Sequence, residues 1–175
     1  ALEGSAITLL RDALWGSMGL PTGTYTLDLN GKTLSGSNDL MIDASLTICD
    51  SQGGGKLWRD GTILVLGGHV AITGGQFNRV YLASDSADLS VTGGTFARIT
   101  SEDAVYPRAA LPFRTAYQQA DGQLIRRSDI TPTLENVAVV SCPHDEIDGI
   151  TCRICGTKMV AKVAKDDTLR YFAVF

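Results

Sequence analysis

Four residues in the last quarter of the chain are of the types that hold metal ions. Cys142, His144, Cys152 and Cys155 follow the pattern C-x-H-x7-C-x2-C. A Cys-x2-Cys pair followed by glycine makes a turn in which both sulfurs face one point. Three thiolates and one imidazole suit tetrahedral zinc. Because protein groups fill all four positions, the pattern favours a closed, structural zinc site over a catalytic one.

The same cysteines leave other chemistries open. One or two disulfides, or free thiols, would use the same residues, and a secreted setting favours disulfides. Cys49 stands apart from the motif, at the corner position of a repeat described below, and we interpret it as a small filler thiol. His69 follows two glycines, Gly67 and Gly68, which is typical of a corner of the chain rather than of a metal ligand.

A repeated stretch in the first hundred residues must position everything that follows. Residues 70–77 and 89–96 both read apolar, small, apolar, Thr, Gly, Gly, polar, Phe. The apolar residues alternate with period two, as in a strand with one buried face. Similar pairs begin, at intervals of 19 to 24 residues, at Ile7, Leu27, Leu46, Val70 and Leu89. Short strands with Gly, Asn, Asp and Ser corners predict an all-β fold, a right-handed single-stranded parallel β-helix.

Stacked coils place equivalent side chains in inward ladders. The first predicted ladder contains Leu9, Leu29, Ile48, Ile72 and Val91, and the second contains Leu14, Leu34, Leu57, Phe77 and Phe96. A second sheet is assigned to residues 41–42, 63–66 and 80–82.

Three regions follow from this reading. Residues 1–100 are predicted to form the coils. Residues 101–135 are predicted to form an irregular cap or linker that covers the open end, with a short helix near 114–120. Residues 136–175 are predicted to form a zinc-ribbon-like Cys/His appendage with terminal strands. Both ends read as cut, so we expect a monomeric piece of a longer chain.

Bulk properties exclude some function classes. A net charge of -4 and a pI near 5.0 argue against a nucleic-acid partner. No run of eighteen apolar residues is present, so we expect no membrane insertion.

Polysaccharide cleavage on a β-helix needs clustered carboxylates on one sheet face. Asp28 is expected to face outward, but the positions assigned as its equivalents are Thr47, Ala71 and Ser90. The remaining acids fall in corners, where Asp is common for turn reasons. We therefore predict no catalytic residues and no enzyme activity.

Several segments resemble a known family. Residues 25–36 (YTLDLNGKTLSG), 46–57 (LTICDSQGGGKL) and 91–96 (VTGGTF) resemble Gly-rich, pectate-lyase-like right-handed β-helix modules. Such modules occur in large surface proteins of Gram-positive gut and oral bacteria. Residues 142–156 (CPHDEIDGITCRICG) resemble the Cys/His insert that follows them. The likeness spans most of residues 5–160, and implies an extracellular or wall-attached location and an adhesive or carbohydrate-associated role.

The leading hypothesis is a non-catalytic module of a bacterial cell-surface or secreted protein, for adhesion, glycan binding or spacing. Its partner would be a glycan or a host or cell-surface protein. Flat rings make sugar platforms, and the candidates are Trp15, Trp58 and Tyr81. The alternatives are a polysaccharide-processing enzyme or its inactive remnant, and an intracellular zinc module that contacts a protein.

Overall fold

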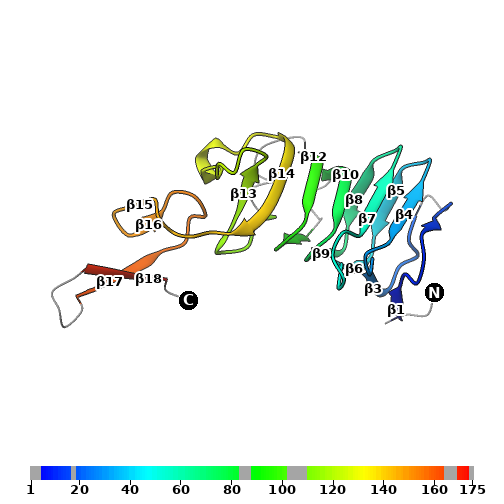
Figure 1. Cartoon of the computed structure of the whole chain (residues 1–175), viewed down its shortest axis with the longest axis horizontal. Helices are drawn as coiled ribbons and strands as arrows, with labels where there is room; N and C mark the ends of the chain where they lie inside the picture. Colours follow the sequence, from blue (N-terminus) through cyan, green and yellow to red (C-terminus); the bar gives the residue numbers. More distant parts are fainter. Residues whose placement is uncertain (1–4, 17–18, 83–87, 102–109, 164–168, 174–175) are drawn as a thin grey trace.

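A computed structural model describes residues 5–16, 19–82, 88–101, 110–163 and 169–173. These residues form strands joined by turns, and their one helical element is a single 3-10 turn, η1 (Arg127–Asp129). Stacked parallel strands at the N-terminal end form a β-solenoid, and the later strands continue along the same long axis (Figure 1). The fold is therefore the parallel β-solenoid that the repeat predicts. No helix in the described part of the chain is long and apolar enough to cross a membrane.

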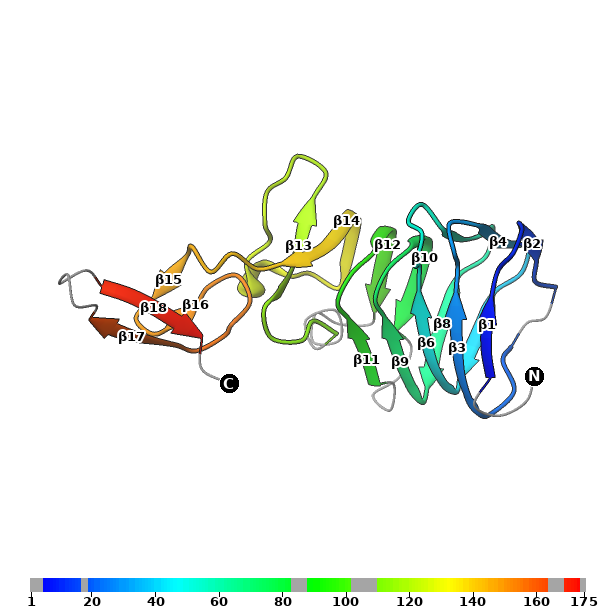
Figure 2. The ribbon, with the colours of Figure 1, turned by 60° about the horizontal axis from the view of Figure 1, so that its bottom comes forward.

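The first sheet runs through five coils. Its strands, in spatial order, are β1 (Ser5–Thr8), β3 (Thr24–Asp28), β6 (Ser45–Cys49), β9 (His69–Ile72) and β11 (Asp88–Val91). Neighbours are parallel throughout, which Figure 2 shows from below. In β3 and β6 buried residues alternate with more exposed ones, because period-two side chains point alternately to core and solvent.

The second sheet forms the other wall of the solenoid. Its coil strands are β2 (Ala13–Leu14), β4 (Thr33–Gly36), β5 (Leu40–Asp43), β7 (Lys56–Arg59), β8 (Ile63–Gly67), β10 (Gln76–Leu82) and β12 (Thr95–Ser101). The longer strand β10 pairs with β7 through its first residues and with β8 through its last. The predicted segments 41–42, 63–66 and 80–82 stack here as expected, with Met41 opposite Leu64 and Leu64 opposite Tyr81.

The first predicted ladder is correct in three coils and displaced in the first two. Ile48, Ile72 and Val91 stack in register, but the residue that stacks on Ile48 is Leu27, not Leu29. Ile7 completes that column in place of Leu9. The reason is that three apolar residues alternate along β3 and the residue after it, and the first of them, Tyr25, takes the place expected for Leu27 opposite Leu46.

The second predicted ladder is correct except at its first member. Leu34, Leu57, Phe77 and Phe96 stack in register, and the rings of Phe77 and Phe96 are parallel with centroids 5.1 Å apart. Ala13, not Leu14, lies opposite Leu34. Leu14 is 84% exposed. A one-residue shift in register therefore turns this leucine to the opposite face.

Antiparallel strands cover the end of the second sheet. β14 (Thr133–Ser141) pairs with β12, and β13 (Thr115–Gln119) pairs with β14. The helix expected near 114–120 is wrong, because this segment is strand β13. Residues such as Thr115 and Tyr117 favour a strand when a neighbouring edge is available, and β14 offers one. β14 also crosses the boundary predicted between residues 135 and 136.

The Cys/His region consists of two short hairpins beyond β14. β15 (Ile147–Asp148) pairs with β16 (Thr151–Cys152), and β17 (Met159–Val163) pairs with β18 (Leu169–Ala173). Figure 1 shows both hairpins at the opposite end of the molecule from β1. Because these hairpins are short, the Cys/His region has few residues with which to form a core of its own.

Candidate metal centre

The four predicted ligands lie together. The donor atoms of Cys142, His144, Cys152 and Cys155 are all within 4.8 Å of one another. The Sγ atoms of Cys142 and Cys152 are 3.6 Å apart, and Cys155 Sγ is 3.4 Å from His144 Nδ1. In a tetrahedral zinc site with Zn–S bonds of about 2.3 Å, neighbouring sulfurs are about 3.8 Å apart. The cluster has the donor types and the spacing to hold one metal ion.

Tight turns bring the second pair of ligands together. The β15–β16 hairpin ends at Cys152, whose backbone amide bonds to the Thr157 carbonyl at 2.9 Å. The Gly156 amide bonds back to the Cys152 carbonyl at 2.8 Å. Gly156 has a φ of 76°, which glycine adopts more readily than other residues. This explains why a glycine directly follows the Cys-x2-Cys pair.

The first pair of ligands is anchored to the cap. Cys142 directly follows β14, and its amide donates to the Arg114 carbonyl at 2.7 Å. His144 adopts a φ of 59°, in the left-handed region, and this returns the chain towards the cluster. The site therefore joins the end of the antiparallel cap to the β15–β16 hairpin.

The thiols are shielded from solvent. Cys142, Cys152 and Cys155 are 7%, 0% and 1% exposed and form a small core with Ala116 and Ile154. Leu124 packs against this core from the cap. The centre is closed, which suits a structural ion better than a reactive one.

Electrostatics favour ligand forms at two of the positions. Burial lowers the pKa of His144, helped by the charge of Arg114, so the imidazole tends to be neutral and able to coordinate. Burial acts to raise the pKa of Cys155, but hydrogen bonds from the hydroxyl and amide of Thr157 outweigh it and lower the pKa. Burial raises the pKa of Cys142, which favours the thiol until a cation is present.

Two surrounding residues were not identified from the sequence. The Thr157 hydroxyl lies 3.0 Å from Cys155 Sγ, and Arg127 Nη1 donates to the Cys155 carbonyl at 3.2 Å. Thr157 has a recognisable position, two residues after the last ligand cysteine. Arg127 is 28 residues away in the chain, and no local pattern points to it.

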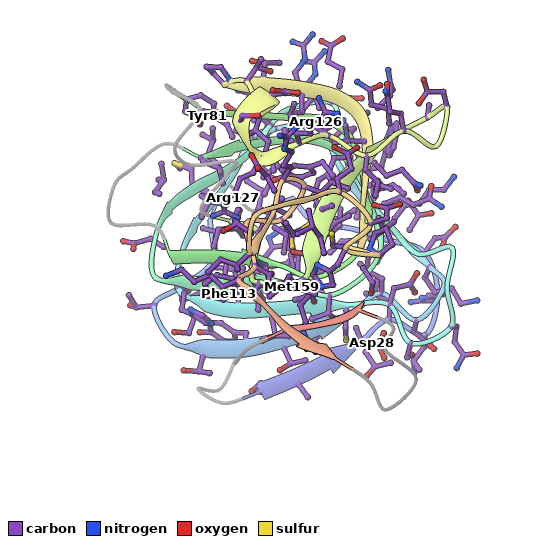
Figure 3. The ribbon with its side chains drawn as sticks, turned by 90° about the vertical axis from the view of Figure 1, so that its left-hand side faces the viewer. Asp28, Tyr81, Phe113, Arg126, Arg127 and Met159 are labelled. Carbon is purple, nitrogen blue, oxygen red and sulfur yellow. The ribbon has the colours of Figure 1, made fainter. Side chains whose placement is uncertain are left out.

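One charged pair joins the Cys/His ribbon to the cap, and a second lies within the ribbon. Arg126 Nε lies 2.6 Å from Glu146 Oε2, and Arg153 pairs with Asp148 at 3.0 Å within the ribbon. Figure 3, which views the molecule from this end, shows Arg126 towards the top of the view and Arg127 below it and to its left. The ligand loops are therefore held by contacts on both sides.

Cys49 and His69, which the sequence predicts not to be metal ligands, lie outside the cluster. Cys49 ends β6 and is half-buried, and burial, together with the carboxylates of Asp28 and Asp50, raises the pKa of its thiol. His69 begins β9 and is exposed. Neither is among the residues grouped around the metal centre.

The corner acids have structural partners. Asp28 Oδ1 accepts the amides of Asn30 and Ser51 at 2.9 and 3.0 Å. Its register partner on the next coil is Cys49, not the predicted Thr47, which pairs with Thr26. The displaced register of β3 causes this difference. In Figure 3, Asp28 lies on the opposite side of the coils from Tyr81.

The three candidate aromatics differ in exposure. Trp15 is half-buried and packs against the core. Tyr81 is half-buried on the outer face of the second sheet. Trp58 follows the inward-facing Leu57 on β7, so its side chain points outward, and it is 45% exposed. Trp58 therefore has the largest exposed aromatic surface of the three.

Comparisons of the chain with protein-family models, with curated proteins and with solved structures find no match.

Proposed function

We propose that this chain is a non-catalytic, glycan-binding module of a secreted or wall-attached bacterial protein. The observation that carries the proposal is Trp58, an outward-facing indole that is 45% exposed on the regular face of a parallel sheet. A flat exposed ring suits stacking against a sugar, and a rigid sheet lowers the entropic cost of positioning it. The extracellular, bacterial location belongs to the same proposal and rests on the resemblance of the repeat segments.

The metal in this proposal is Zn²⁺, with a structural role. Three thiols and one imidazole are the donors that zinc prefers, and the two donor distances of 3.6 and 3.4 Å suit its small tetrahedron. Zinc would stabilise a ribbon whose buried cluster has only a few members. Cys142, His144, Cys152 and Cys155 are the proposed ligands.

One observation favours the alternative, a polysaccharide-processing enzyme. Asp60 and Glu135 line the same shallow depression as Trp58, and a pair of carboxylates beside a sugar platform is the arrangement of a glycosidase. Glu135, however, is paired with Arg98, and the corner acids Asp28, Asp39 and Asp50 accept backbone amides. These engagements favour structural roles for the carboxylates.

The test measures binding and cleavage together. The chain is incubated with a panel of insoluble and soluble polysaccharides, and bound protein, new reducing ends and unsaturated products are quantified. We expect retention on at least one glycan, with no products above a heat-denatured control. Products that disappear in Asp60→Asn or Glu135→Gln would establish the enzyme instead. Absence of retention on every glycan would overturn the binding function.

A further inference from the structure

The outer face of the second sheet carries a row of equivalent residues. Trp58, Asn78 and Ala97 each follow a member of the inward ladder, namely Leu57, Phe77 and Phe96. Because the ladder residues stack in register, the residues after them lie side by side on neighbouring strands. The strands concerned, β7, β10 and β12, run next to each other in Figure 1.

The small side chain of Ala97 leaves this row hollowed. Two shallow depressions, of about 450 and 340 Å³, open on either side, and both are lined by Trp58 and Ala97. Together they make one groove, which we name the Trp58 groove. It crosses β7, β10 and β12 and reaches β14 at Asn136. The groove therefore extends beyond the tryptophan on both sides.

The lining of the groove on its cap side is mostly apolar, and its polar members are uncharged. In the smaller depression Trp58 is accompanied by Gln76, Thr95, Gln118 and Asn136, and none of the described residues that line it is charged. Amides and hydroxyls supply both donors and acceptors, which sugar hydroxyls require. The other depression is lined by two acids, Asp60 and Glu135, and two bases, Arg79 and Arg98, so its charges balance, and Arg98 forms an ion pair with Glu135.

We infer that the Trp58 groove binds an uncharged, extended oligosaccharide, with one pyranose ring on Trp58 and the next unit over Ala97. The inference rests on the proposed glycan-binding function and adds the place, the charge and the length of the ligand. An aromatic platform contributes apolar contact, and a short row of polar side chains fixes orientation. A chain of several sugars fills both depressions, whereas a monosaccharide occupies only one.

The experiment compares three variants against neutral and anionic probes. Binding of β-1,4-glucan, β-1,4-mannan and β-1,3-glucan hexasaccharides, and of a galacturonate hexasaccharide, is measured by calorimetry with the full chain. Trp58→Ala removes the platform, and Ala97→Leu fills the floor while leaving Trp58 in place. We expect at least tenfold weaker binding of a neutral hexasaccharide in both, and tenfold weaker binding of its monosaccharide to the wild type. Met41→Ala, at an exposed residue of the same sheet that lines neither depression, should stay within twofold.

Each result separates this inference from the function on which it rests. If Trp58→Ala and Ala97→Leu leave glycan binding unchanged, the glycan does not bind in the Trp58 groove, but the glycan-binding function stands. Preference for the galacturonate probe, lost in Arg79→Gln, would overturn the uncharged ligand. If the chain binds none of the probes or polysaccharides, both the groove and the glycan-binding function are overturned. Melting temperatures of the variants show whether a loss of binding is a loss of folding, and Trp58→Phe, which keeps a smaller ring, should bind with intermediate affinity.

Discussion

Asp50 joins two neighbouring coils: its Oδ1 accepts the backbone amide of Gly31, 19 residues earlier, at 2.8 Å. The same link recurs between Asp28 and Ser51, 23 residues apart, at 3.0 Å. Asp12 and Asp39 accept amides one coil later in the same way, from Thr33 and Thr62. Corner carboxylates therefore fix one coil to the next, by satisfying amides that the turns leave without strand partners.

Replacing Asp28 with asparagine should weaken the fold in a pH-dependent way. The amide of Ser51, followed by its hydroxyl, lowers the pKa of Asp28 below its ordinary value of 3.8. A carboxyl with a lowered pKa stabilises the fold above its ordinary pKa and loses that contribution as the pH falls through the lowered value. The urea midpoint of Asp28→Asn should therefore lie below that of the wild type at pH 7, and the difference should shrink as the pH falls below 3.8.

The control for this prediction is Asp43→Asn. Asp43 is exposed on β5, and the described residues give its carboxylate no hydrogen bond to another coil. Its urea midpoint should match that of the wild type at pH 7 and at pH 3. An Asp28→Asn difference that persists undiminished at pH 3 would show that the carboxylate acts by shape rather than by charge.

Two leucines from the predicted second ladder test the packing of the coils. Leu57 is 1% exposed, whereas Leu14 is 84% exposed. Leu57→Ala should lower the free energy of unfolding by about 2–5 kcal/mol, because it removes buried methyl groups and leaves a cavity. Leu14→Ala should change it by less than about 0.5 kcal/mol. Chemical denaturation of both variants measures this, and equal losses would show that the first coil is packed as the repeat alone predicts.

The coils could be predicted from the sequence because period-two alternation and a near-constant interval are local signals. The register of β3 could not, because Tyr25, Leu27 and Leu29 are all buried and alternate. Two pairs match the template, Tyr25 with Leu27 and Leu27 with Leu29. Only the pairing of Tyr25 with Leu46 decides between these two registers. The repeat pattern begins with an aliphatic residue in each coil, so it does not include the aromatic Tyr25 at the start of this strand.

The clustering of Cys142, His144, Cys152 and Cys155 could be predicted because their residue types and spacing are specific. Their surroundings could not, since they come from distant segments. Ala116 lies in the buried cluster with Cys152, and Arg114 accepts the amide of Cys142, although both belong to the cap. The cap was expected to be irregular with a short helix. Its strand β13 forms only because β14 offers an edge, which is a tertiary effect.

Gly55 should not tolerate a side chain. A Cβ at this position would lie 2.6 Å from both Leu29 Cβ and Asp50 Oδ1, and the Gly55 amide donates to Asp50 Oδ2 at 2.6 Å. Gly55→Ala should therefore lower the free energy of unfolding by about 1–3 kcal/mol through overpacking. Gly16→Ala is the matched control, because nothing lies within 4 Å of its Cβ position. Thermal melts in which both variants equal the wild type would contradict the close approach.

Removal of the proposed metal should loosen the cap as well as the ribbon. The buried cluster includes Ala116 of β13 and is packed by Leu124, so its loss reaches beyond residue 142. The solenoid keeps its own core, built on residues such as Ile48 and Ile72. After chelation, hydrogen exchange should rise in residues 115–125 and 142–159 and stay slow in β6 and β9. The far-ultraviolet strand signal should be largely retained.

Metal content and thiol state decide the chemistry of the same cluster. Elemental analysis should find one zinc per chain with all four cysteines reduced, since tetrahedral zinc uses three thiolates and one imidazole. Cys142→Ser should release the metal and reproduce the exchange pattern of chelation, whereas Cys49→Ser, at a half-buried thiol outside the cluster, should retain it. A metal-free protein with a disulfide between Cys142 and Cys152 would replace the ion by a covalent link. Cooperative melting of β6 and β9 on chelation would contradict an independent solenoid, because those strands contribute no residue to the metal cluster.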